Sequence, residues 1–377
     1  MQKIIKNVAG VKMKKILVIF GTRPEAIKMC PVVNELKKRQ GIKVFTCVSG
    51  QHRELLLSVV HRFGVTVDIN LNIMKEHQTL FDITESVIEK FKNILGNIAP
   101  DIVLVHGDTS TAFAAALACF YMQVPVGHVE AGLRSGNAFE PYPEEFNRRA
   151  ISLISSYDFA PTEDAKGNLL REGKNENKIF VTGNTVIDAL GTTVRKDYFH
   201  EELEWVRDSK LIILTSHRRE NTGDPMRSVF KAVRKIAEEK NDVKIIFPIH
   251  PNPKVRQIAE GELLGVKNIH IIEPLDVMDF HNFLARSYFV VSDSGGIQEE
   301  ASALSKPVLV LRNNTERPEG VKAGTLKLVG TDENEVYENI KLLIEDNEVY
   351  KKMTTAKNPY GDGNSSRRIA DILKRMV

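Results

Sequence analysis

The feature that most constrains the fold of this chain is a regular alternation of short apolar runs with longer amphipathic segments. Runs such as KILVIF (15–20), IVLV (102–105) and YFVV (288–291) are apolar throughout. Runs of this kind, separated by helical patterns, are typical of parallel strands covered by helices on both faces. The alternation restarts at LIILTSH (211–217), which predicts a second unit built like the first.

The length of 377 residues favours two domains. We expect an α/β fold with two Rossmann-like, doubly wound domains and a cleft between them. The predicted domains are residues 13–184 and 185–360, followed by a helical segment, 361–377, that begins with Asn and Ser capping residues. Met13 is the expected start of the fold, and whether residues 1–12 belong to it stays open.

Composition excludes several classes of function. The net charge of +3 is spread along the chain, so nothing indicates a nucleic-acid partner. No run of about 18 apolar residues is present, so no membrane span is expected. The three cysteines, Cys30, Cys47 and Cys119, lack a CxxC spacing, which favours a reducing cytoplasm. Neither a nicotinamide-binding G-x-G-x-x-G after a strand nor histidines at metal-ligand spacing occur, so we expect no cofactor and no metal.

Three polar turns follow predicted strands. They are HGDT (106–109), HVEAGLR (128–134) and SDSGGIQEE (292–300). Ligands of open α/β sheets bind at the carboxyl ends of the strands, where these turns must lie. Asp108 and Glu130 in the first two turns therefore predict acid/base chemistry. The alternative for Asp108 is a helix N-cap, and for Glu130 an ordinary ion pair.

The third turn predicts an anion site, because Ser294, Gly295 and Gly296 would present backbone amides at a helix N-terminus. Glu300 follows in the first turns of that helix, at a distance suited to a ribose diol. The alternative is a glycine turn that merely begins a helix.

Charged residues of other turns are expected at the same strand ends. Each has a solvated or capping interpretation as the alternative. They are Arg23 and Lys28 in FGTRPEAIK, Arg134 at the end of the second turn, Glu144 and Arg148 beyond it, His217, Arg218 and Arg219 in SHRREN, and Arg317 in TERPE.

Eight motifs occur in one order along residues 15–320: FGTRPEAIKM, GQHRELL, HGDTSTAFAAALA, HVEAGLR, PEEFNRR, HRREN, SDSGGIQEEA and TERPE. Together they resemble the non-hydrolysing UDP-N-acetylglucosamine 2-epimerases. The resemblance implies a glycosyltransferase-B-type fold with a deep interdomain cleft and a terminal helix that crosses back to the first domain. It also implies a homodimer that interconverts UDP-N-acetylglucosamine and UDP-N-acetylmannosamine for surface polysaccharide, by elimination and re-addition of UDP without a cofactor.

The same resemblance implies roles for individual residues. Asp108, Glu130 and Glu144 would be the acid/base set, and Lys28, Arg148 and His217 would be counted with the catalytic residues. Glu300 would hold the ribose, and Phe280 with the backbone near Leu275 would flank the uracil. The pyrophosphate would contact Arg23, His217, Ser294, Gly295 and Gly296. The sugar side would be lined by Lys28, Asp108, Glu130, Glu144, Arg148 and Arg317.

Bacterial members of that family bind a second UDP-N-acetylglucosamine as an activator. The residues that correspond to this motif are Gln51, His52, Glu54, His77, Arg218 and His250. Glu54 and His77 depart from the family pattern, which indicates either no activation or altered contacts.

Three other functions stay open at this stage. A hydrolysing relative would release UDP and free N-acetylmannosamine. The residues of the motifs do not distinguish it from the epimerase. A glycosyltransferase of the same fold would need an acceptor site, for which the sequence has no signal. A nucleotide-sugar sensor could dispense with the three carboxylates, so the presence of Asp108, Glu130 and Glu144 favours an enzyme.

Overall fold

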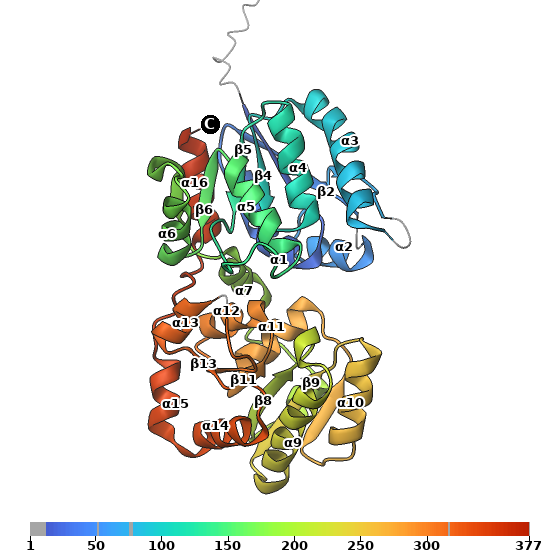
Figure 1. The fold of residues 1–377 in the computed structure, drawn as a ribbon, viewed down its shortest axis with the longest axis vertical. Helices are drawn as coiled ribbons and strands as arrows, with labels where there is room; N and C mark the ends of the chain where they lie inside the picture. Colours follow the sequence, from blue (N-terminus) through green and yellow to red (C-terminus); the bar gives the residue numbers. More distant parts are fainter. Residues whose placement is uncertain (1–12, 51–52, 75–77, 316, 377) are drawn as a thin grey trace, which may run out of the picture. The chain divides into compact units, whose positions relative to one another are not determined.

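The computed structural model describes residues 13–50, 53–74, 78–315 and 317–376 (Figure 1). These residues form two compact units. Unit 1 contains the described residues up to Asp188 together with those from Asn364 onward. Unit 2 runs from Ala189 to Gly363. Within the described residues, each unit contains one parallel sheet with helices on both faces, which confirms the predicted α/β class.

Unit 1 contains a seven-stranded sheet in the order β3-β2-β1-β4-β5-β6-β7, counted over the described residues. Each neighbouring pair is parallel, as the apolar runs predicted. The strands are β1 (Lys14–Phe20), β2 (Ile42–Val48), β3 (Ile69–Asn70), β4 (Ile102–His106), β5 (Val126–Val129), β6 (Tyr157–Ala160) and β7 (Ile179–Val181).

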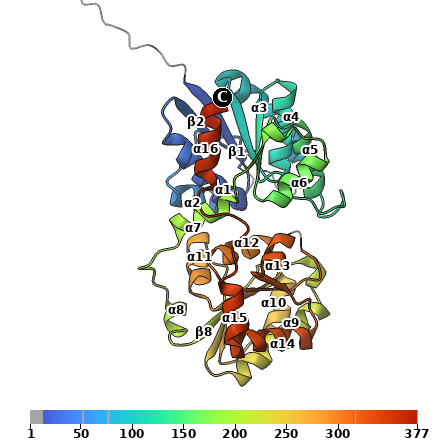
Figure 2. The same ribbon diagram turned by 90° about the vertical axis from the view of Figure 1, so that its left-hand side faces the viewer.

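Helices cover both faces of this sheet. Helices α3, α4 and α5 pack together over one face, and α1 packs with α2 and α16 over the other (Figures 1 and 2). The helices are α1 (Arg23–Lys37), α2 (Arg53–Arg62), α3 (Leu80–Ile98), α4 (Ser110–Tyr121), α5 (Glu144–Ile154), α6 (Glu163–Arg171), α7 (Thr185–Thr193), which ends in unit 2, and α16 (Ser365–Met376), with the 3-10 turn η1 (Glu176–Lys178).

Unit 2 repeats the design with six strands in the order β10-β9-β8-β11-β12-β13. Helices α9, α10 and α14 pack over one face, and α11, α12 and α13 over the other. The strands are β8 (Lys210–Thr215), β9 (Val243–Pro248), β10 (Ile269–Ile272), β11 (Phe289–Ser292), β12 (Val308–Val310) and β13 (Leu326–Leu328). The helices are α8 (Glu201–Trp205), η2 (Arg219–Asn221), α9 (Asp224–Glu239), α10 (Pro253–Leu263), α11 (Val277–Arg286), α12 (Gly295–Ala303), α13 (Pro318–Ala323), α14 (Glu333–Glu345) and α15 (Asn347–Thr354).

Two short strands were not expected from the sequence. Strand β3 has two residues and pairs in parallel with β2. Strand β13 is the other. It has only three residues, LKL, and the lysine is exposed, so it has no continuous apolar run to signal it. Short edge strands of this kind carry little pattern in the sequence.

Helix α16 is held to unit 1 at its start and at its middle. The carboxylate of Asp188 on α7 accepts hydrogen bonds from the backbone amides of Ser365 (3.1 Å) and Ser366 (2.7 Å). Halfway along the helix, Arg39 Nε lies 2.9 Å from Oδ1 of Asp371. The helix start predicted from Asn and Ser is therefore capped by a carboxylate from another part of the chain.

Each sheet reverses its strand order once, between β1 and β4 in unit 1 and between β8 and β11 in unit 2. Open α/β sheets bind ligands beyond the carboxyl ends of the strands at such a point of reversal. Among the described residues, no helix has both the length and the apolar character needed to cross a lipid bilayer.

Candidate active site

The turn after β1 is built around one buried carboxylate. Thr22 is the N-cap of α1, and Glu25 three residues later completes a capping box. The Oε2 atom of Glu25 accepts hydrogen bonds from the backbone amides of Gly21 (3.0 Å) and Thr22 (2.8 Å). Its Oε1 atom accepts from Thr109 Oγ1 at 2.9 Å, which ties this turn to the turn after β4. Burial raises the pKa of Glu25 above its ordinary value.

Gly21 shows how closely these turns approach each other. A Cβ atom at this position would lie 2.4 Å from Ser49 Oγ and 2.6 Å from Thr111 Oγ1. Neither contact is sterically allowed, so the turn after β1 requires glycine for space.

The strand end at β5 carries Glu130 in a strained conformation. Its φ angle is 63°, in the left-handed region that non-glycine residues rarely adopt. Its carboxylate forms a buried ion pair with Lys28 of α1 and accepts a hydrogen bond from Asn184 Nδ2 at 3.0 Å. His106 Nε2 lies 3.5 Å from the same oxygen. Backbone strain of this kind is typically found at functional sites.

The pKa of Glu130 lies well below its ordinary value. Burial alone would raise this pKa, but the charge of Lys28, with His106, outweighs burial. Glu130 is therefore a carboxylate at neutral pH. Lys28, which we expected to reach an anion, already has an anionic partner in the protein itself.

Asp108 lies in the turn after β4, next to the true N-cap of α4, Thr109. Arg148 of α5 contacts its Oδ2 atom through Nη2 (2.6 Å) and Nε (3.2 Å). Asn147 Nδ2 donates to the backbone carbonyl of Asp108 at 2.9 Å. Arg148 also lies 3.0 Å from buried Glu145. The capping alternative for Asp108 was therefore wrong, because its side chain is engaged by α5 instead.

The carboxylates predicted at this edge differ in their surroundings. Glu144 begins α5 and is partly exposed, and no ion pair or hydrogen bond is recorded for its side chain among the described residues. Its neighbour Glu145 is fully buried and pairs with Arg148 and Arg149. Arg134, which was expected among the site charges, pairs instead with Glu172 at 2.6 Å.

His128 links two of the turns from inside the sheet. Its Nε2 atom lies 2.7 Å from the carbonyl oxygen of Gly107, and its Nδ1 atom lies 3.9 Å from Asp158. The side chain is fully buried, and burial lowers its pKa to about 3. His128 is therefore neutral, and its Nε2–H holds the turn that contains Asp108.

In unit 2, the turn after β8 is organised by Asp293. This buried residue follows β11 and accepts hydrogen bonds from the backbone amides of His217 (2.9 Å) and Arg218 (3.0 Å). Arg218 Nε also donates to the Asp293 carbonyl at 2.9 Å. The His217 ring stacks on His250 with 5.5 Å between ring centroids. Three residues expected at an anion or activator site thus lie together.

The N-terminus of α12 lies beside this turn in the sheet, because β8 and β11 are neighbours. Ser294 is its N-cap, and Gly295 and Gly296 form its first turn. Glu300 follows on the same helix, and its Oε2 atom lies 3.7 Å from Nε2 of buried His281. The sequence prediction of an acidic residue in the first turns of this helix agrees with these positions.

The remaining predicted residues of unit 2 lie around α11 and α13. Leu275 and Phe280 are partly buried and pack against the apolar core beneath α11 and α12. Arg317 is buried at the start of α13, where its Nε lies 2.8 Å from Glu299. Arg317 thus has a carboxylate partner on α12.

The predicted activator residues are only partly described. Gln51, His52 and His77 lie outside the described residues, and Glu54 is known only as part of the first turn of α2. Within the described part of the chain, no group of three or more His, Cys, Asp or Glu side chains could hold a metal ion.

A family model described as UDP-N-acetylglucosamine 2-epimerase matches residues 34–374. A protein of Bacillus subtilis named UDP-N-acetylglucosamine 2-epimerase is 55% identical over 362 residues, which are 96% of this chain and 95% of that protein. The chain belongs to the UDP-N-acetylglucosamine 2-epimerase family. The resemblance inferred from the eight motifs is thereby confirmed.

Two solved structures agree with this membership. The UDP-GlcNAc 2-epimerase from Neisseria meningitidis bound to UDP-GlcNAc is 46% identical, with a TM-score of 0.89 over 96% of this chain and 100% of that one. A complex of S. aureus MnaA with UDP is 50% identical, with a TM-score of 0.89 over 96% of each chain.

The epimerase motifs divide between the two units. Unit 1 carries Arg23, Lys28, Asp108, Glu130, Glu144 and Arg148. Unit 2 carries His217, Arg218, His250, Leu275, Phe280, Ser294, Gly295, Gly296, Glu300 and Arg317. Four further residues support these groups and were not singled out from the sequence: Glu25, His128, Asn184 and Asp293. For Glu25, the Thr-x-x-Glu capping box was a readable signal.

Proposed function

We propose that this protein catalyses the reversible C2 epimerisation of UDP-N-acetylglucosamine to UDP-N-acetylmannosamine. The observation that carries the proposal is the pair of ion-paired carboxylates, Asp108 and Glu130, at the ends of neighbouring strands in a chain of this family. Relatives with this activity in their names match nearly the full length of the chain.

The chemistry of the substrate explains why such a site is needed. The C2 proton has no adjacent carbonyl, so it is poorly acidic. In the proposed route a base removes it, its electron pair forms the C1=C2 bond of a 2-acetamidoglucal, and the C1–O bond breaks as UDP leaves. In the return step C2 is protonated on the opposite face, and a UDP oxygen bonds to C1. Electrons balance without an oxidant, so no redox cofactor is required.

Asp108, Glu130 and Glu144 are the proposed acid/base set. Glu130 is ionised at neutral pH because of Lys28 and His106, so it suits a base or an electrostatic role better than an acid. Glu144 is partly exposed and begins a helix, where a proton can exchange with solvent. Arg148 and Lys28 would offset negative charge at the sugar.

Unit 2 supplies the proposed site for the uridine diphosphate portion. The amides of Gly295 and Gly296 at the start of α12 suit a diphosphate, whose developing charge on leaving must be stabilised. His217 and Ser294 of the same unit complete the proposed pyrophosphate contacts there. Glu300 would hold the ribose, Phe280 and the backbone near Leu275 would flank the uracil, and Arg317 would contact the sugar side.

We also propose a second UDP-N-acetylglucosamine as activator, with Arg218 and His250 among its contacts. The stacking of His250 on His217 supports this, because it joins a predicted activator residue to a predicted substrate residue. Glu54 and His77 still depart from the family pattern, so the contacts would differ from those of other bacterial members.

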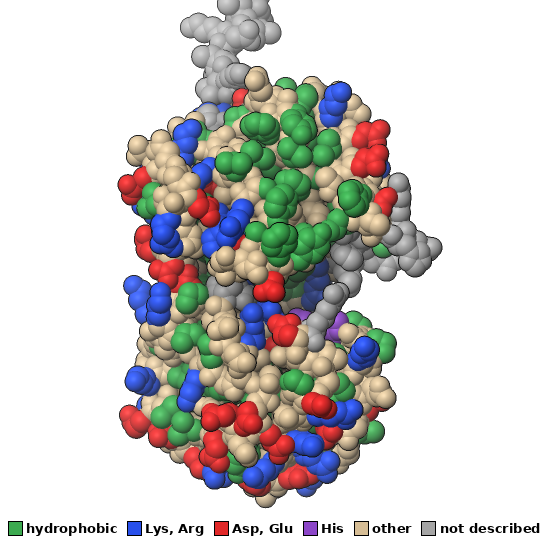
Figure 3. All heavy atoms as spheres, viewed as in Figure 1, with side chains coloured by type: hydrophobic (Ala, Val, Ile, Leu, Met, Phe, Trp, Pro, Cys, Tyr) green, Lys and Arg blue, Asp and Glu red, His purple; other side chains and the backbone are tan. Residues whose placement is uncertain are grey.

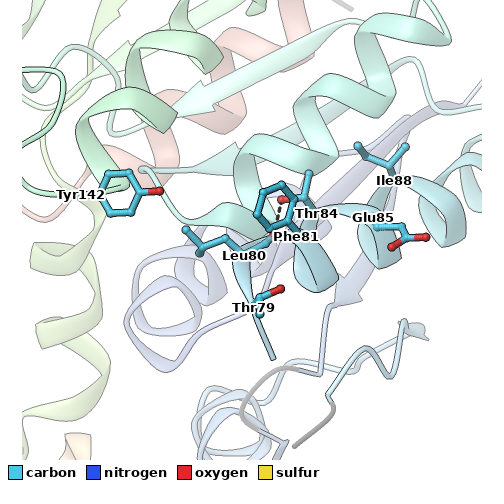
Figure 4. Close-up of a pocket in the computed structure, with 7 residues that line it drawn as sticks. All are labelled: Thr79, Leu80, Phe81, Thr84, Glu85, Ile88 and Tyr142. Carbon is cyan, nitrogen blue, oxygen red and sulfur yellow. Dashed lines mark hydrogen bonds between the residues drawn. The ribbon is translucent and has the colours of Figure 1, made fainter. Parts of the chain in front are cut away.

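A homodimer is proposed from the surface of unit 1. Large apolar side chains are exposed on the face covered by α3, α4 and α5 (Figure 3). Phe81 is 85% exposed and Leu153 is 82% exposed. Leu80 and Phe81 of α3 and Tyr142 from the loop before α5 line an apolar hollow on this face (Figure 4). Such patches typically mark protein interfaces.

A cytoplasmic location is part of the same proposal. All three cysteines, Cys30, Cys47 and Cys119, are free and buried. Proteins that keep unpaired cysteines are typical of reducing compartments, which supports this location.

The experiment that tests the proposal is proton NMR of the purified protein with UDP-N-acetylglucosamine in D₂O, without nicotinamide. We expect UDP-N-acetylmannosamine with deuterium at C2, since the proton is lost to solvent in the elimination. Free UDP with N-acetylmannosamine would assign the chain to the hydrolysing reaction instead. No reaction, even with added substrate as activator, would contradict an enzymatic role.

A further inference from the structure

A single buried oxygen atom organises the turn after β8. The Oδ2 atom of Asp293 accepts hydrogen bonds from Ser216 Oγ (3.1 Å), His217 N (2.9 Å), Arg218 N (3.0 Å) and Asn221 Nδ2 (3.2 Å). Asp293 is fully buried, so these donors replace the water that its charge would otherwise need. The conformation of the whole turn therefore depends on this carboxylate.

The second oxygen of Asp293 faces the imidazole of His217. Oδ1 lies 3.2 Å from Nδ1 of His217, and no other donor reaches this buried oxygen among the described residues. A buried acceptor that is left without a donor is unfavourable. The proton of a neutral His217 ring is therefore expected on Nδ1, directed at Asp293.

The charge of Asp293 supports this arrangement. Burial alone would raise its pKa, but His217 and the backbone amides of the turn outweigh burial and hold the pKa below its ordinary value. Asp293 is thus a carboxylate at neutral pH and can only accept hydrogen bonds. The His217 side chain itself is 39% exposed, and its ring stacks on His250 at an angle of 17°. The stacking limits rotation of the ring.

We propose that Asp293 is the positioning residue of the anion site in unit 2: it fixes His217 as the Nδ1–H tautomer and leaves Nε2 for a diphosphate oxygen. To donate from Nε2, the ring must carry both protons, and the carboxylate on the far side stabilises that charge, as in the Asp–His pairs of hydrolases. The choice of a diphosphate as the ligand rests on the proposed function. The assignment of the His217 tautomer does not depend on that function.

The test begins with the full-length wild-type protein, without a ligand. Long-range ¹⁵N NMR of histidine-labelled protein distinguishes the two tautomers, and the His217 signals are assigned by their loss in His217→Gln. We expect protonated Nδ1 at a pH where the ring is neutral. Protonation on Nε2 instead would overturn the proposal, and this measurement needs no variant of Asp293 to fold.

The Asp293→Asn variant then separates positioning from a structural role. Its carbonyl can still accept from the backbone amides, but its NH₂ group would face His217 and force the proton onto Nε2. We expect that reversal. Because an asparagine carries no charge to stabilise the doubly protonated ring, we also expect calorimetry to show UDP binding that is about 10-fold or more weaker. Asp242→Asn, a matched change at an exposed position of unit 2, should leave the His217 tautomer and the affinity for UDP unchanged.

Two outcomes overturn the ligand half of the proposal. One is a reversed tautomer with wild-type affinity for UDP, which would show that the tautomer does not matter for binding. The other is a wild-type protein that binds no UDP. In that second case the proposed function fails, while the NMR result alone still decides the assignment of Asp293 to His217.

Discussion

Arg148 contacts one oxygen of Asp108 with two nitrogen atoms, Nη2 at 2.6 Å and Nε at 3.2 Å. The arginine is almost fully buried, and its third nitrogen contacts buried Glu145 at 3.0 Å. Asp108 therefore cannot turn away from the strand end without leaving a buried arginine unsatisfied. The contact fixes the direction of a proposed acid/base group.

Replacing Asp108 by Asn should lower turnover about 10²-fold or more, the usual scale for the loss of an acid/base group. The amide has nearly the same shape, so the fold should persist. Steady-state kinetics with UDP-N-acetylglucosamine gives the measurement. Asp164→Asn, an exposed position on α6, is the matched control. Turnover near the wild-type value in Asp108→Asn would remove this residue from the mechanism.

Replacing Lys28 by Met should destabilise the fold by about 3–5 kcal/mol at neutral pH, because Glu130 would keep a buried charge without its cation. The lowered pKa of Glu130 contributes stability that is present above its unfolded value of 4.5 and is lost as the pH falls through the folded value. The difference in free energy of unfolding between variant and wild type should therefore become smaller at acidic pH. Urea unfolding at several pH values measures this difference, and a difference that does not change with pH would argue against the ion pair.

Replacing Thr109 by Val should lower the free energy of unfolding by about 1–3 kcal/mol, since the buried Glu25 loses a donor and α4 loses its N-cap. Turnover should also fall, because Thr109 adjoins Asp108. Thr162→Val removes the N-cap hydroxyl of α6 and should lower stability alone. Thr109→Ser should restore both properties. Equal turnover in the two valine variants would mean that the Glu25 link does not position the site.

His128 predicts a pH effect on stability. Its pKa is lowered to about 3 by burial, against 6.5 in the unfolded chain. Between these values the unfolded chain binds a proton that the folded protein does not, so stability falls as the pH falls. His128 alone should account for about 2 kcal/mol between pH 7.5 and 5. His128→Gln can still donate to Gly107. In this variant the fall in unfolding free energy between pH 7.5 and 5 should be smaller by this amount.

The matched control for that measurement is His61→Gln, at an exposed position of α2. It corrects for the loss of a histidine as such. The two variants should differ in the slope of unfolding free energy against pH. Identical slopes would mean that His128 is protonated in the folded protein after all.

The apolar face of unit 1 predicts the oligomeric state. Wild-type protein should sediment at twice its chain mass of 42.4 kDa. Leu153→Glu, on α5, should shift it to the monomer, because a charge would have to be buried in the interface. Leu264→Glu, which is 72% exposed in unit 2, changes the same residue type and should leave the dimer intact. A wild-type protein that sediments as a monomer at micromolar concentration would contradict the proposal.

The strands were predictable because a strand buried on both faces needs an apolar side chain at every position. Strand β4 was expected from the apolar run at 102–105 and runs from Ile102 to His106. Strand β13 escaped because it is short and has an exposed lysine. The positions of Asp108 and Glu130 were also predictable, since each follows such a strand directly. Their interaction partners were not predictable, because the residues of a turn carry no information about which distant side chain will contact it.

The sequence by itself determined the α/β class, the strand ends that carry charged turns, and several helix starts, because these depend on neighbouring residues. Only the tertiary structure decided which side chains form ion pairs and hydrogen bonds with each other. Lys28 and Glu130 are 102 positions apart, and Glu25 and Thr109 are 84 apart. The neighbouring parallel strands β1, β4 and β5 bring these residues together at the carboxyl ends of the strands. The charge state of a buried group follows from those partners, and so it is a property of the fold.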